Sequence, residues 1–178
     1  MKKTQKYVLE GYAAVTGNID LGGDRIEPGA FQNLEGLKQH GALLYAHRAD
    51  RLPVAVIESA QEDAHGLLVL CRFHGSTAAI EAAKMVEDRL RRGATVGLSI
   101  GYRTLVSEPA RSPPVKRILH EIQVLEVSLV LQPMNPLAQV NLLITPEGEE
   151  IRPLQTLTGA ERARILVRRL ANRRRSSF

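Results

Sequence analysis

The chain has 178 residues, of which 44% are hydrophobic and 24% are charged, a composition that suits one soluble domain with a sizeable core. Its single cysteine, Cys71, excludes a disulfide framework or a zinc site made of several cysteines within one chain, and we expect it to be a small core residue. No apolar run has the length of a membrane-spanning helix, and the basic start lacks the apolar stretch of a signal peptide, so we expect neither.

The net charge of +5 is distributed unevenly along the chain. Residues 151–178 contain eight arginines and one acid, Glu161, a net charge of +7 that leaves −2 for the rest. A basic tail of this kind suits an acidic partner, nucleic acid or a membrane surface, or is simply a solvated helix end. The sequence leaves these alternatives open.

Turn signals and apolar alternation predict a fold with many strands and two or three helices. We expect a domain over 1–144, a linker over 145–157 and a basic C-terminal helix or tail over 158–178. This pattern predicts a β-barrel or sandwich with attached helices. The expected strands are 7–15, 42–46, 54–59, 66–73, 95–105, 116–131 and 138–144, and the expected helices are 30–39, 78–92 (with Ile80, Ala83, Val86 and Leu90 on its apolar face) and 160–169.

One predicted strand carries a serine between two glycines, in the segment Gly97-Leu98-Ser99-Ile100-Gly101. Because side chains alternate along a strand, Ser99 shares its face with the glycines, and a substrate backbone can approach its hydroxyl closely. His47, at the end of an earlier strand, is a candidate base for this nucleophile. The segment also matches the nucleophile elbow of α/β-hydrolases, but there a helix follows the serine, whereas here the strand continues.

The strand 116–131 is apolar on both faces around residue 126, so the Glu126 carboxylate is predicted to be buried. Regular alternation would place it on one face with Ile122, Val124, Ser128 and Val130. A buried carboxylate needs a cationic or hydrogen-bonding partner. The partner is either an imidazole that becomes cationic during catalysis or an arginine in a structural pair. No two histidines show the spacing of a metal site, so we expect no catalytic metal.

The chain resembles the prohead proteases of HK97-like tailed bacteriophages, which mature the viral capsid. Five groups of matching residues follow one another in the same order and at similar spacing. They are Glu10-Gly11-Tyr12-Ala13; Gly23-Asp24 with Pro28-Gly29-Ala30-Phe31; Leu43-Leu44-Tyr45-Ala46-His47; Gly97-Leu98-Ser99-Ile100-Gly101-Tyr102; and Leu125-Glu126-Val127-Ser128-Leu129-Val130 with Pro133, Asn135-Pro136 and Ala138.

This resemblance implies a mainly β (α+β) fold with flanking helices, similar to the herpesvirus assembly proteases: a closed or partly open β-barrel of about six to eight strands. It also implies a serine endopeptidase of the Ser-His-acid type. Ser99 would be the nucleophile, His47 the base and Glu126 the third member, with Asp50 or His120 as alternatives for the third. Backbone amides or one of Arg91, Arg92 and Arg103 would form the oxyanion hole. Asp24 is expected to be a structural turn or cap residue.

The same resemblance implies the substrates and partners. They are the scaffold segment of the major capsid protein and the protease itself, in the host cytoplasm inside the assembling prohead, with a homo-oligomer possible. We expect no cofactor and no membrane partner, and the acidic body and scarce aromatic residues argue against nucleic acid. The alternative is a catalytically silent scaffold or assembly protein of the capsid interior with the same fold. The presence of Ser99, His47 and Glu126 argues against that alternative.

Overall fold

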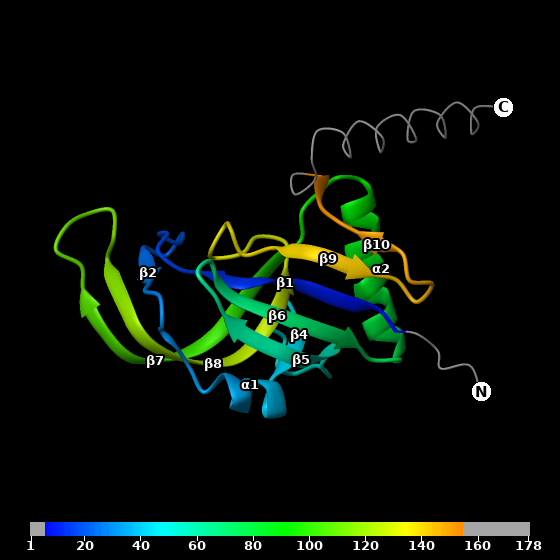
Figure 1. Cartoon of the computed structure of the whole chain (residues 1–178), viewed down its shortest axis with the longest axis horizontal. Coiled ribbons are helices and arrows are strands. Elements are labelled where there is room, and N and C mark those ends of the chain that lie inside the picture. The colour runs from blue at the N-terminus through cyan, green and yellow to red at the C-terminus, as the bar shows by residue number, and fades with distance from the viewer. Residues whose placement is uncertain (1–5, 155–178) are drawn as a thin grey trace.

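The structure, a computed structural model, describes residues 6–154 (Figure 1). This range contains two helices, α1 (Leu34–His40) and α2 (Thr77–Arg91), and ten strands. The strands are β1 (Val8–Val15), β2 (Asp24–Ile26), β3 (Phe31–Gln32), β4 (Ala42–Tyr45), β5 (Ala55–Glu62), β6 (Gly66–Phe73), β7 (Gly97–Pro109), β8 (Arg117–Val130), β9 (Val140–Ile144) and β10 (Glu150–Ile151).

All ten strands belong to one mixed sheet in the order β10-β9-β1-β6-β5-β4-β8-β2, with β3 and β7 also paired to β8. The two ends of this order do not pair with each other, so the sheet is not closed into a barrel. The mainly β fold with flanking helices is confirmed, in its partly open form. The short strands β2, β3 and β10 were not expected, because two or three residues are too few to show alternation.

The predicted division into domain, linker and tail is not tested by these residues. The strand β10 pairs with β9 inside the segment that was expected to be a linker. The basic tail over 158–178, with its predicted helix over 160–169, lies outside the described residues.

Helix α2 packs its apolar stripe against the sheet, close to the strands β9 and β10 (Figure 1). Ser76 caps its N-terminus, where the hydroxyl accepts a hydrogen bond from the Ala79 backbone N–H. The buried stripe includes Ala79 rather than the expected Ile80, which is 37% exposed. Cys71 is fully buried, as expected. Neither helix of the described part is long and apolar enough to cross a membrane.

Strand β8 is the hub strand of the sheet, by which we mean that four other strands pair with it. One edge pairs antiparallel with β7, and the other pairs in parallel with β2, β3 and β4 in turn. The pairing with β7 contains a bulge: Gly101 lies opposite Glu126, but Tyr102 lies opposite Val124, so Leu125 is the extra residue. Leu125 is accordingly half exposed.

The bulge corrects the predicted alternation of this strand. Val124 is buried in the core, whereas Glu126 lies on the opposite face, together with Ser128. The two groups were expected on one face, and the inserted residue moves them to different faces because the side-chain period of a strand is two. The bulge therefore turns the Glu126 carboxylate away from the core, although the residues on both sides of it in the sequence are apolar.

An ion pair holds β2 against the hub strand. Asp24 Oδ1 accepts a hydrogen bond of 3.0 Å from Arg117 Nε, and a second guanidinium nitrogen binds Oδ2. The Tyr102 hydroxyl donates to the same carboxylate at 3.1 Å. The turn residue is Asp20, whose Oδ1 accepts from the backbone N–H groups of Gly22 and Asp24. Asp24 is structural, as expected, but it acts as the anion of an ion pair rather than as a turn or cap residue.

The Asp24–Arg117 pair makes stability depend on pH. Hydrogen bonding to Arg117 lowers the pKa of Asp24, so its stabilisation is present above the unfolded-state pKa of about 3.9 and is lost as the pH falls through the lower folded-state pKa. Denaturant unfolding of Asp24→Asn and of the wild type should therefore show a large stability difference at pH 7 that shrinks below about pH 4. A difference that stays constant down to pH 2.5 would contradict this role.

Candidate active site

The segment that carries His47 leaves the sheet through an unusual backbone conformation. After β4, Ala46 and His47 both have left-handed φ angles, 52° and 56°. Residues other than glycine adopt this conformation only where the surrounding structure imposes it. Here the Ala46 N–H still donates to the carbonyl of Leu129, at 2.9 Å, while the His47 N–H turns to the hydroxyl of Ser128, at 3.1 Å.

The side chains of His47, Glu126 and Ser128 form one hydrogen-bonded chain. His47 Nδ1 lies 2.6 Å from Glu126 Oε1, and the Ser128 hydroxyl donates to Glu126 Oε2 at 2.7 Å. The exposed fraction of the side chain is 43% for His47 and 19% for Glu126, and Ser128 is fully buried. Both carboxylate oxygens are therefore engaged. The carboxylate is only partly buried, and its partners are an imidazole and a hydroxyl rather than an arginine.

Ser128 is the site residue that the sequence analysis missed. It was recognised only as a neighbour of Glu126 on a strand, whereas its hydroxyl joins the Glu126 carboxylate to the backbone of His47. A serine two residues from a carboxylate, in a strand predicted to be buried, was the available signal, since buried hydroxyls are nearly always hydrogen-bonded.

Strand β7 places Ser99 directly beside this chain. Ser99 pairs with Ser128 across the two strands, and Gly101 pairs with Glu126. A Cβ atom on Gly101 would lie 2.5 Å from Glu126 Oε1, so only glycine leaves room for the carboxylate. The glycine two residues earlier, Gly97, makes room for the ring of Pro133 instead. Each glycine of the Gly-x-Ser-x-Gly pattern therefore has its own steric cause.

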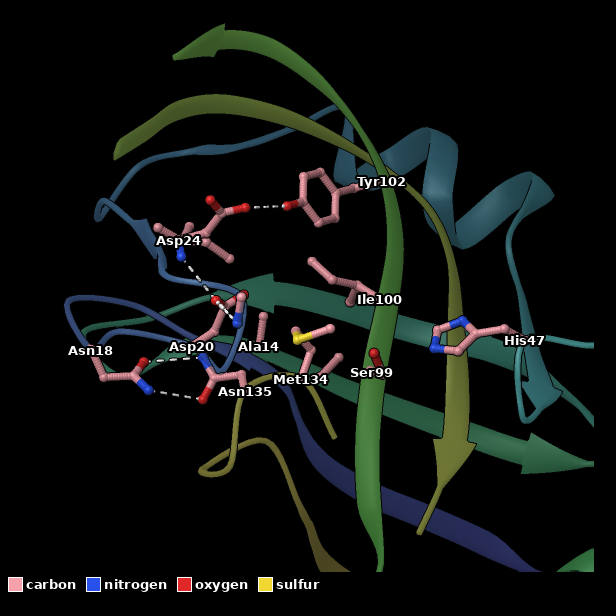
Figure 2. Close-up of a pocket in the computed structure, with 13 residues that line it drawn as sticks. Ala14, Asn18, Asp20, Asp24, His47, Ser99, Ile100, Tyr102, Met134 and Asn135 are labelled. Carbon is pink, nitrogen blue, oxygen red and sulfur yellow. Dashed lines mark hydrogen bonds between the residues drawn. The ribbon is translucent and has the colours of Figure 1, made fainter. Parts of the chain in front are cut away.

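Ser99 and His47 line the same cavity, which has a volume of about 280 Å³ and lies along the edge of β7 (Figure 2). Within residues 6–154, no hydrogen bond joins the Ser99 hydroxyl to the imidazole. The structure thus brings His47 and Glu126 into direct contact, with Ser99 on the neighbouring strand at the same opening. In free enzymes, hydrogen bonds between such groups are often long and shorten when a substrate binds.

The alternative third residues have other partners. Asp50 forms a two-pronged pair with Arg48, at 2.7 Å for each contact. His120 faces Glu108 at 3.4 Å on the exposed hairpin of β7 and β8. Of the acidic residues and histidines considered from the sequence, it is Glu126 that contacts His47.

Two of the arginines proposed for the oxyanion hole are engaged elsewhere. Arg91 pairs with Glu87 and Glu149, and Arg92 pairs with Asp88. Arg103 lies four residues beyond Ser99, which is roughly 13 Å along a strand. These placements favour backbone N–H groups as the oxyanion donors. Among the described residues, no group of three or more His, Cys, Asp or Glu side chains is arranged to hold a metal ion.

Comparison with known proteins gives the family of the chain. The model of the caudovirus prohead serine proteases matches residues 1–152. The chain belongs to this family. It is 33% identical over 154 residues to the prohead protease of Enterobacteria phage HK97, an alignment that covers 83% of this chain and 65% of the relative, less than two thirds of the relative's length.

A solved structure is similar at lower identity. It is the KSHV protease in complex with a hexapeptide phosphonate inhibitor, with a TM-score of 0.46 and 14% sequence identity. The similarity covers 91% of this chain and 75% of that chain.

The contact between Gly101 and the carboxylate leads to a prediction. In Gly101→Ala the new methyl group would overlap Glu126 Oε1, so we expect the carboxylate to move and its bond to the imidazole to break. A crystal structure, or the imidazole N–H resonance of His47 in NMR spectra, would detect this. Gly75→Ala is the matched control, since a Cβ there meets nothing within 4 Å. An unchanged His47–Glu126 distance in Gly101→Ala would contradict the prediction.

Proposed function

We propose that this protein is a serine endopeptidase that cleaves the capsid protein during prohead maturation, with Ser99 as nucleophile, His47 as base and Glu126 as the acid. The observation that carries this proposal is the 2.6 Å contact between His47 and Glu126 at the cavity that Ser99 also lines. Membership of a serine protease family agrees with this chemistry.

In this proposal each ring nitrogen of His47 has its own role. Nδ1 faces Glu126, so in the neutral imidazole the proton lies on Nδ1 and is donated to the carboxylate. Nε2 is then the acceptor for the Ser99 proton as the hydroxyl attacks a peptide carbonyl, and it later returns that proton to the leaving amine. Glu126 fixes the tautomer and stabilises the imidazolium that forms.

Ser128 is a positioning residue in this proposal because it acts through its two neighbours. Its hydroxyl holds Glu126 Oε2, and it accepts the backbone N–H of the strained His47. One buried side chain therefore fixes both the acid and the backbone that carries the base. Since a misplacement of about 1 Å can cost about 100-fold in rate, this positioning matters for catalysis.

The substrates and partners are part of the same proposal. The enzyme would remove the scaffold segment of the major capsid protein and cleave itself, inside the prohead that assembles in the host cytoplasm. The residues described supply nucleophile, base and acid, so the proposed reaction needs no cofactor. The basic tail over 158–178 would be a separate segment that engages the scaffold or is removed by self-cleavage.

The decisive test is co-expression with the matching capsid protein. We expect wild type to truncate the capsid protein, itself or both at defined sites, and Ser99→Ala to leave both chains intact, as read by intact-mass spectrometry. The exposed Ser107→Ala on the same strand is the matched control and should behave as wild type. Intact chains with the wild type, in assembled shells, would instead favour the silent scaffold protein.

The role of Ser128 makes a separate kinetic prediction. With a peptide that spans the mapped cleavage site, Ser128→Ala should lower kcat about 10- to 100-fold and leave KM within about two-fold, because the base is misplaced while the binding surface is intact. Glu126→Gln should lower kcat as well. An unchanged kcat in a folded Ser128→Ala protein would show that the hydroxyl is only structural.

A further inference from the structure

We infer that the cavity beside Ser99 binds the substrate side chain on the acyl side of the scissile bond, and that Asp20 selects lysine or arginine there. This inference rests on the proposed function, since it names the substrate class of the same site. It is carried by three observations: an unpaired strand edge, apolar cavity walls and an unpaired carboxylate opposite Ser99.

The edge of β7 that faces away from β8 is available to an extended peptide. Up to Leu98 this edge is occupied, because the Leu98 N–H donates to the carbonyl of Ala138 and Gly97 bridges to Gln139. From Ser99 onward, no strand of residues 6–154 pairs with this edge. A peptide that adds to it as a further strand would pass Ser99 and direct alternate side chains to the two faces of the sheet.

The cavity opens beside this edge and has apolar walls. Ala13, Ala14 and Ile26 are buried there, and Ile100 and Met134 complete the walls. Its volume of about 280 Å³ lies just below the usual range for pockets that hold drug-sized ligands. A space of this size suits one long side chain, and the walls suit an aliphatic stem.

The carboxylates that line the cavity differ in what they bind. Asp24 forms an ion pair with Arg117, and the charge of Asp20 lies within electrostatic range of the same guanidinium. Asp20 uses Oδ1 to accept two backbone N–H groups, and within residues 6–154 it forms no ion pair and its Oδ2 accepts no hydrogen bond. No lysine or arginine lines the cavity. Asp20 therefore presents a carboxylate whose Oδ2 can accept a hydrogen bond from a side chain that enters the cavity.

The positions of these groups match the shape of a basic side chain. Figure 2 shows Asp20 across the cavity from Ser99, with Ile100 and Met134 between them. A lysine or arginine that enters from the side of Ser99 lays its methylene groups on the apolar walls and brings its charged end to the carboxylate. An apolar side chain would desolvate Asp20 without a partner, and an acidic one would be repelled.

The variant Asp20→Asn removes the negative charge of this side chain but keeps its role in the turn. An asparagine Oδ1 still accepts the two backbone N–H groups that shape the turn, so the loop keeps its acceptor while the cavity loses its negative charge. Asp88→Asn is the matched control, since Asp88 pairs with Arg92 on the exposed end of α2.

The experiment measures how fast Ser99 is labelled by three peptidyl phosphonates that differ only in the residue next to phosphorus: lysine, norleucine or glutamate. Norleucine is lysine without the ammonium group. Intact-mass spectrometry follows the labelling of the full chain, alone and co-assembled with capsid protein, and Ser99→Ala reports any labelling elsewhere. We expect lysine to react at least about ten times faster than norleucine, the effect of one hydrogen bond to a charged group, and glutamate to react slowest.

In Asp20→Asn the lysine probe should slow and the norleucine probe should react somewhat faster, so that their rates come within about two-fold, while the Asp88→Asn control keeps the wild-type rates. Equal rates for lysine and norleucine in the wild type would overturn the inference and leave the proposed function intact. A preference for lysine that survives in Asp20→Asn would overturn the role of Asp20. Absence of Ser99 labelling by every probe, in both preparations, would contradict the proposed function itself.

Discussion

The pairing of β8 with strands on both of its edges is the constraint on which the rest of the site depends. One edge holds β4, which delivers His47, and the other holds β7, which delivers Ser99. Glu126 and Ser128 belong to β8 itself, so the groups of the site come from two adjacent strands and from the turn that directly follows a third. Backbone hydrogen bonds within a sheet fix the relative position of strands firmly, and a reactive constellation on such a scaffold is held more precisely than one on loops.

Partial burial of the Glu126 carboxylate costs solvation free energy, which its hydrogen-bond partners offset. A carboxylate that is 19% exposed needs its oxygens satisfied, and His47 and Ser128 satisfy one each. Space for it is provided by the absence of a side chain at Gly101. The left-handed backbone at His47 is strained, and the hydrogen bond from its N–H to the buried Ser128 hydroxyl offsets that strain. The network is thus mutually dependent, and loss of one member leaves the others unsatisfied.

The sequence was sufficient to predict the long strands, but not the contacts between side chains on different strands. Alternation and turn residues predicted the long strands, and Ser99 and His47 line one cavity while Glu126 contacts His47. Ser128 was missed because one of its two partners, the His47 backbone N–H, follows another strand, and no local pattern encodes a hydrogen bond across the sheet. The match to the Gly-x-Ser-x-Gly elbow of α/β-hydrolases also arises from contacts between distant parts of the chain. Here Gly97 accommodates Pro133 and Gly101 accommodates Glu126, contacts unrelated to a strand-to-helix turn.

The extra residue in β8 also limits how the chain can change in length. Leu125 shifts the phase of the strand, so that Val124 before it faces the core and Glu126 after it faces His47. Deletion of the residue between Glu126 and Ser128 would place these two side chains on opposite faces and break the hydrogen-bonded chain to His47, whereas loss of Leu125 would only remove the bulge. The hairpin tip around 110–116 carries no such phase relation. Evolutionary insertions and deletions should therefore accumulate at the tip and be absent between Glu126 and Ser128.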